Sequence, residues 1–152
     1  MTELLGLPVR AASRPEEVAA ESEILVTATS SREPVLLGAW LEPGHHVNAV
    51  GSNALTRREI DELAVTRADF IAADSVEQAK LECGDLVAVV EAGKLSWDRV
   101  KELADVVVSG FTRGPEDITL FESQGIAIED VAAAKVVYER GREQGRGRRL
   151  DV

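Results

Sequence analysis

The sequence contains little that could build a disulfide framework, a metal centre or a membrane span. Its single cysteine, Cys83, cannot form an internal disulfide, and no other metal-binding residues surround it at the spacing of a metal site. No apolar run is long enough to cross a bilayer, and residues 1–7 lack the basic and apolar regions of a secretory signal. We therefore expect a cytoplasmic protein with no metal ion and no membrane association.

Basic residues are also scarce, which restricts the possible partners. The 152 residues include 17 lysines and arginines against 27 acidic residues, so the formal charge is −10. A nucleic acid or an anionic membrane requires a basic face, and we expect this protein to bind neither. The arginines between residues 140 and 149 are the local exception, and segment 144–152 is predicted to be a solvated basic tail.

Short apolar runs alternate with helix-forming segments along the rest of the chain. Strands are predicted at residues 9–12, 24–29, 47–50, 69–74, 106–108 and 118–121. Helices are predicted between several of these strands and at residues 86–92, 97–103 and 126–143. Because such an alternation produces right-handed crossovers, we expect one α/β domain with a mostly parallel, doubly wound sheet.

Three segments match the capping-box pattern of a helix start. In this pattern a Ser or Thr hydroxyl and the Glu or Gln side chain three residues later satisfy free backbone amides. The segments are Ser13–Glu16, Thr56–Glu59 and Ser75–Gln78. Each is predicted to begin a helix that follows a strand.

Three predicted strands end in small or polar residues that suit a ligand site. These ends lie at residues 27–29, 50–53 and 122–125, and parallel strands would bring them to the same edge of the sheet. Hydroxyls, amides and glycine permit close approach of a nucleotide or a nicotinamide ring. The chain contains no Gly-x-Gly-x-x-Gly motif, so the first strand-turn-helix of a Rossmann unit is not expected in it.

The adjacent histidines and the cysteine are weaker candidates for chemistry. His45 and His46 would point to opposite faces of a strand, and no third ligand lies near them, so we expect them only to begin the strand. Cys83 has no basic neighbour that would favour a thiolate. We expect it to be a small buried side chain.

Three motifs, in the same order, resemble the ornithine cyclodeaminase and mu-crystallin family. They lie at residues 24–36, 41–51 and 118–130. The resemblance implies that residues 1–143 form part of the family's NAD(P)-binding Rossmann domain, incomplete at its N-terminal end. It also implies NAD or NADP as cofactor and an amino acid or cyclic imine as substrate of the intact protein. A homodimer, or association with a separate N-terminal half, is expected.

The resemblance also assigns residues to the cofactor site. The threonine-alanine-threonine strand end would contact the nicotinamide nucleotide, and the valine-glycine strand end with its loop would lie by the nicotinamide ring. A basic residue at the next helix start and a serine near the carboxamide complete the set. The corresponding residues are Thr27, Ala28, Thr29, Val50, Gly51, Asn53, Arg57 and Ser123.

Asn53 departs from the cyclodeaminase pattern, which has an aspartate at this position. A carboxylate can accept a proton during imine hydrolysis, whereas an amide is not a useful base near neutral pH. We therefore favour a dehydrogenase or imine reductase over a cyclodeaminase, with Asn53 beside the reacting centre. Two alternatives remain. Asn53 can be a loop residue that adopts a left-handed conformation or caps a helix, and the chain can be a non-enzymatic module that needs a separate N-terminal half.

Overall fold

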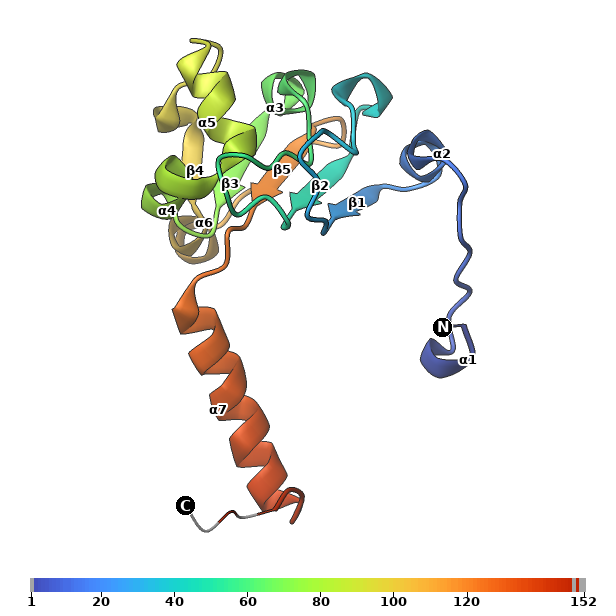
Figure 1. Ribbon diagram of the computed structural model, residues 1–152, viewed down its shortest axis with the longest axis vertical. Helices are drawn as coiled ribbons and strands as arrows, with labels where there is room; N and C mark the ends of the chain where they lie inside the picture. The colour runs from blue at the N-terminus through green and yellow to red at the C-terminus, as the bar shows by residue number, and fades with distance from the viewer. Residues whose placement is uncertain (1, 149, 151–152) are drawn as a thin grey trace.

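The computed structural model describes residues 2–148 and residue 150 as an α/β fold with a five-stranded sheet (Figure 1). The strands are β1 (Ile24–Thr27), β2 (His46–Ala49), β3 (Phe70–Ala73), β4 (Val100–Glu102) and β5 (Thr119–Glu122). The helices are α1 (Thr2–Leu5), α2 (Pro15–Ala20), η1 (Gly38–Trp40), α3 (Glu62–Arg67), α4 (Val76–Glu82), α5 (Gly84–Glu91), η2 (Trp97–Arg99), α6 (Leu103–Ser109) and α7 (Ala127–Glu143).

The sheet is parallel throughout and has the order β1-β2-β5-β3-β4. The last strand in the sequence, β5, therefore lies between β2 and β3. Leu120 of β5 is level with Val47 of β2 on one side and with Ile71 of β3 on the other. The predicted α/β class with a mostly parallel, Rossmann-like sheet is confirmed, and so is the long C-terminal helix.

One face of the sheet carries the hydrophobic core. Alternate residues of the strands point to this face, and Val47, Ile71 and Leu120 are almost completely buried there. Side chains of α3 and α5 join the same cluster, including Val65 and Leu86. The core is therefore built from residues that the strand and helix patterns bring to a single layer.

The opposite face is covered only in part. Helix α6 packs near β3 and β4, where Phe70 stacks on Phe111 with ring centroids 3.8 Å apart. Toward β1 the face becomes bare, because Ile24 and Val26 are each 63% exposed. An apolar groove of about 420 Å³ runs between these two regions and is lined by residues that include His46, Asn48, Phe70, Val106 and Phe121.

Helix α7 extends away from the sheet, and α1 also lies apart from it (Figure 1). None of the residues of α7 is buried, and Ile128 and Val131 are mostly exposed. The predicted boundary of the basic tail at residue 144 follows the end of α7, although Arg149 and residues 151–152 lie outside the described part of the chain. No helix within residues 2–148 and 150 combines the length and apolar character needed to cross a membrane.

Two predicted strands are wrong. Residues 106–108 belong to helix α6, although β-branched residues favour strands. The edge position beside β3 is taken by β4, a strand that the prediction had included in a helix at 97–103. Residues 9–12 are not in a strand either, and the Val9 amide donates to the Thr2 hydroxyl instead of to a neighbouring strand.

Of the three predicted capping boxes, only the last forms a cap. The Ser75 hydroxyl accepts from the Gln78 amide at 3.4 Å and begins α4. Helix α2 begins instead at Pro15, whose fixed φ suits the first turn, and the N-cap side chain makes no capping bond. The prediction at Thr56–Glu59 is wrong because α3 begins at Glu62 and is capped by Asp61.

Candidate functional site

The ends of β1, β2 and β5 lie side by side at the carboxyl edge of the sheet. The Val50 amide donates to the Thr27 carbonyl at 2.9 Å, and the Ser123 amide donates to the Ala49 carbonyl at 3.0 Å. These bonds continue the parallel ladders past the last strand residues. The structure thus brings together the three strand ends singled out in the sequence.

The exposure of the predicted site residues differs along this edge. Thr27 is buried beneath it, Gly51 and Arg57 are half-buried, and Ser123 is half-buried at the end of β5. The exposed members are Ala28, Thr29, Val50 and Asn53. The surface open to a ligand therefore consists of a methyl group, a hydroxyl, an isopropyl group and an amide.

The Glu59 carboxylate joins the ends of β1 and β2 from below. It accepts from the Thr27 hydroxyl at 2.9 Å, from the Gly51 amide at 2.7 Å and from the Thr29 amide. Its side chain is fully buried. This residue had been expected to cap a helix, and no local signal distinguishes the two roles, because its partners lie up to 32 residues away in the sequence.

A second buried carboxylate, Asp85 at the start of α5, holds the backbone of Glu59. Its Oδ1 atom accepts from the amides of Glu59 at 2.9 Å and Ile60 at 3.2 Å. Burial raises the pKa of Asp85 from 3.8 to about 6, although the two amide bonds oppose the rise. Within the described residues its Oδ2 atom has no hydrogen-bond partner.

The loop after β2 is held by its own side chains and by α5. The Ser52 hydroxyl donates to the Arg57 carbonyl at 3.0 Å, and the Arg57 guanidinium donates to Asn53 Oδ1 at 2.8 Å. Gly84 at the start of α5 has no room for a Cβ, because the Arg57 carbonyl occupies that space. The alternative roles for Asn53 are not observed: its φ is not positive and Asp61 caps α3.

The end of β5 is organised by Asp74, which follows β3. Its Oδ2 atom accepts from the Ser123 hydroxyl at 2.8 Å and from the Gly125 amide at 2.7 Å. Asp74 is itself buried. Asp74 is not among the predicted site residues, although an acidic residue at the end of a predicted strand on this edge is a usable signal.

Glu122 and Cys83 form a separate buried pair under the edge. The Cys83 thiol donates to Glu122 Oε2 at 3.4 Å, and Glu122 Oε1 has no partner among the described residues. Burial raises the pKa of Glu122 well above its usual value, and the nearby Asp85 carboxylate adds to this rise. Burial also raises the pKa of Cys83. The cysteine is a buried free thiol, as expected.

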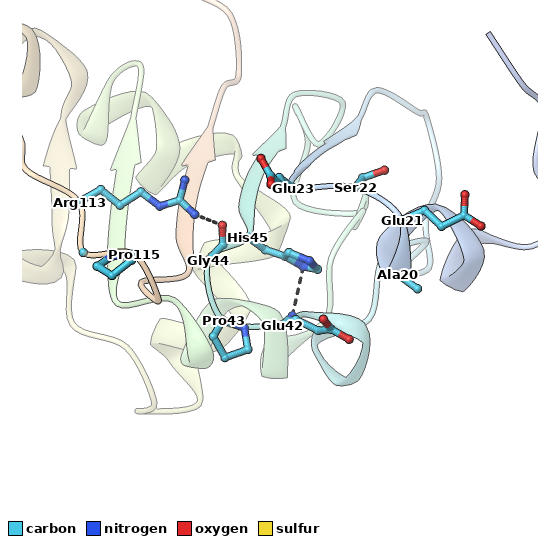
Figure 2. A pocket seen from close by; sticks show the side chains of 11 residues that line it. Ala20, Glu21, Ser22, Glu23, Glu42, Pro43, Gly44, His45, Arg113 and Pro115 are labelled. Carbon is cyan, nitrogen blue, oxygen red and sulfur yellow. Dashed lines mark hydrogen bonds between the residues drawn. The ribbon is translucent and has the colours of Figure 1, made fainter. Parts of the chain in front are cut away.

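A polar cavity of about 620 Å³ lies at the opposite, amino edge of the sheet (Figure 2). His45 lines it, but its Nδ1 atom accepts from the Glu42 amide at 3.1 Å. Arg113 is likewise engaged with the Gly44 carbonyl. His46 points elsewhere and is 2.7 Å from the Thr119 hydroxyl. The described residues contain no group of His, Cys, Asp and Glu side chains that could hold a metal ion.

The comparisons with known proteins agree with this architecture. The sequence model of the ornithine cyclodeaminase/mu-crystallin family matches residues 1–145. The chain belongs to this family. Its relatives include the alanine dehydrogenase of Archaeoglobus fulgidus, which is 37% identical over 145 residues, covering 93% of this chain and 44% of that protein.

Solved structures of the family have the same fold. The Δ1-pyrroline-2-carboxylate reductase of Thermococcus litoralis, in complex with NADH and L-proline, matches with a TM-score of 0.89 and 34% identity over 98% of this chain and 47% of its own. The iminosuccinate reductase of Paracoccus denitrificans, in complex with NAD+, matches with a TM-score of 0.85 and 30% identity over 99% and 46%. The chain therefore spans about half the length of these family members.

Proposed function

We propose that the carboxyl edge is the nicotinamide-facing half of a dinucleotide site. It would belong to an NAD(P)-dependent protein that acts on amino acids or cyclic imines as a dehydrogenase or imine reductase. The observation that carries the proposal is the meeting of three strand ends with small polar groups at one edge. The proposed contact residues are Thr27, Ala28, Thr29, Val50, Gly51, Asn53, Arg57 and Ser123.

The chemistry of the exposed groups fits the nicotinamide end of such a cofactor. A nicotinamide ring needs an apolar surface, which Ala28 and Val50 can offer, and its carboxamide needs donors and acceptors, which the hydroxyl of Thr29 can offer. When bound, the cofactor supplies hydride transfer. The family members solved with NADH or NAD+ support this choice, while NAD and NADP remain equal candidates.

The pyrophosphate end has no comparable candidate in this chain. Its usual binding element, a glycine-rich turn at a helix N-terminus, has no counterpart in the 152 residues. We therefore propose that the chain alone binds a dinucleotide weakly and has negligible turnover. The buried single cysteine fits a reducing compartment such as the cytoplasm.

Asn53 supports a reductase or dehydrogenase over a cyclodeaminase. Its amide cannot act as a base near neutral pH, and its Oδ1 atom already accepts from Arg57. The proposed role of Asn53 is to hold the Arg57 guanidinium, together with its own amide, beside the reacting centre. A hydride-transfer reaction needs the ring and the imine to be positioned more than it needs a carboxylate at this place.

Calorimetric titration of NADH and NADPH into the chain tests the proposal. We expect weak, saturable binding that decreases in Thr27→Val and Ser123→Ala, with folding checked by circular dichroism. Thr66→Val is the matched control, because Thr66 lies on α3 and its hydroxyl bonds only to α3 carbonyls. The proposal would be contradicted if the folded wild-type chain bound neither nucleotide. It would also be contradicted if Thr27→Val and Ser123→Ala bound the nucleotides as tightly as the wild type.

A second candidate is a non-enzymatic module that needs a separate N-terminal half. The bare face beside β1, with Ile24 and Val26 exposed, favours it, because an open strand edge and apolar surface invite a covering partner. The DNA upstream of the coding sequence distinguishes the candidates. A nearby segment that encodes Gly-x-Gly-x-x-Gly in a strand-turn-helix favours an enzyme fragment, and unrelated sequence there favours the module.

A further inference from the structure

We infer that Glu59 is the positioning residue of the proposed nicotinamide half-site. Its carboxylate ties the loop after β1 to the loop after β2 and so sets the distance between the two surfaces that would face the ring. The inference rests on the proposed function, since it takes this edge as the cofactor side. Glu59 itself would not touch the cofactor, because it is completely buried.

The partners of Glu59 all belong to the strand ends. Thr27 and Thr29 donate from the β1 end, and Gly51 donates from the β2 end. Two of these donors are backbone amides, whose positions follow the path of each loop directly. A change at Glu59 therefore moves or loosens the loops themselves, not one side chain.

A carboxylate suits this position better than any neutral side chain. All three partners are donors, and an ionised carboxylate is purely an acceptor with room for several hydrogen bonds. A glutamine would turn its NH2 group toward at least one donor and lose that bond. Charge-assisted hydrogen bonds of this kind are also stronger than neutral ones.

The surroundings of Gly51 show how closely the two loops are joined. A Cβ atom at this position would clash with the Thr29 carbonyl and would come within 2.5 Å of Glu59 Oε1. The φ of Gly51 is not positive, so its backbone conformation does not demand glycine. The close approach of the Thr29 carbonyl and Glu59 does. The same contact explains why the loops can share one buried acceptor.

Glu59 is in turn fixed from the other side. Its amide donates to Asp85, and its carbonyl accepts from the amides of Val35 at 2.8 Å and Leu36 at 3.0 Å. The backbone of Glu59 is thus bonded to α5 and to the segment that follows β1. Because both its amide and its carbonyl are hydrogen-bonded, Glu59 is suited to fix the distance between the two loops.

Glu59→Gln in the full chain tests the inference, with two measurements on the folded protein. We expect hydrogen exchange at the Thr29 and Gly51 amides, followed by NMR, to become about tenfold faster, because at least one hydrogen bond to the carboxylate is lost. We expect the dissociation constant for NADH to rise by a similar factor of about ten.

Glu122→Gln is the matched control. Glu122 is as deeply buried as Glu59 and lies under the same edge, but none of its hydrogen bonds reaches the loops after β1 and β2. Both measurements should stay at wild-type values. Faster exchange at Thr29 and Gly51 in this variant too would mean that the loss of any buried carboxylate loosens the edge, and the inference would be wrong.

The remaining outcomes separate the inference from the proposed function. If exchange and NADH affinity are both unchanged in Glu59→Gln, or if only exchange changes, Glu59 does not position the half-site. If the wild-type chain binds no nucleotide, the proposed function fails, while the exchange data still decide whether Glu59 holds the loops. If Glu59→Gln does not fold, Thr27→Val removes one donor to the same carboxylate, and faster Thr29 exchange is expected.

Discussion

The two faces of the sheet differ in how completely they are covered. The face that carries Val47, Ile71 and Leu120 is packed by helices and almost inaccessible to solvent. The face that carries Ile24 and Val26 is open beside β1 and only partly covered beside β3. The composition of the two faces differs as well, because β2 contributes Val47 and Ala49 to the packed face but His46 and Asn48 to the open one.

At the carboxyl edge, the ends of β1 and β2 are tied to the packed face through Glu59. Glu59 bonds to both strand ends and to Asp85 of α5, the helix whose Leu86 lies in the core. The contacts of Glu59 therefore form although the open face beside β1 is uncovered.

The largest effect on stability is expected at the centre of the packed face. Ile71→Ala removes a fully buried side chain from β3 and leaves a cavity, so the free energy of unfolding should fall by about 4 kcal/mol. Urea denaturation measures it. Val26→Ala on the open face is the control, with an expected change below about 0.5 kcal/mol. Equal losses would remove the distinction between the faces.

The next effect concerns pH. Asp85 keeps its proton to a higher pH in the folded state, where its pKa is about 6, than in the unfolded chain, where it is near 3.8. The folded state thus binds more protons between these values, and its stability falls as the pH rises from about 4 to about 6. Ionisation of Asp85 should lower the free energy of unfolding by roughly 3 kcal/mol over this pH range.

Asp85→Asn should remove this part of the pH dependence. Its Oδ1 atom can still accept from the amides of Glu59 and Ile60, and the variant has no charge to bury. Urea denaturation at several pH values between 4 and 7 measures the change. A variant with the same decline in stability as the wild type would show that Asp85 does not cause it.

A smaller effect is expected at the end of β5. Ser123→Ala removes the hydroxyl that donates to Asp74 but leaves the bond from the Gly125 amide to the same oxygen. The loss in stability should be about 1 kcal/mol, the usual net value of one hydrogen bond. Thermal unfolding followed by circular dichroism measures it. A loss as large as that of Ile71→Ala would place this contact in the core.

The smallest effect on stability is expected on the open face. Val26→Lys places a charge on an exposed position of the edge strand β1 and should change stability by less than about 0.5 kcal/mol. It should nevertheless weaken concentration-dependent self-association, because charged residues protect open strand edges. Analytical ultracentrifugation compares the two proteins. Unchanged association would show that this face does not mediate it.

Local sequence patterns were sufficient to predict the secondary structure of segments whose structure depends on their own residues. The runs at 24–29, 47–50, 69–74 and 118–121 each contain a strand, and Ser75 caps α4 as predicted. Parallel order followed from the alternation of strands and helices. The three strand ends therefore met at the expected edge, because parallel strands bring their carboxyl ends together.

Only the tertiary structure decided which residues hold that edge. Glu59 matches a capping box, yet its partners are Thr27, Thr29 and Gly51, which become neighbours only after β1 and β2 pair. The valines at 106–108 favour a strand, but β4 occupies the position beside β3 and these valines lie in helix α6. Such outcomes depend on contacts between distant segments, and no local pattern contains that information.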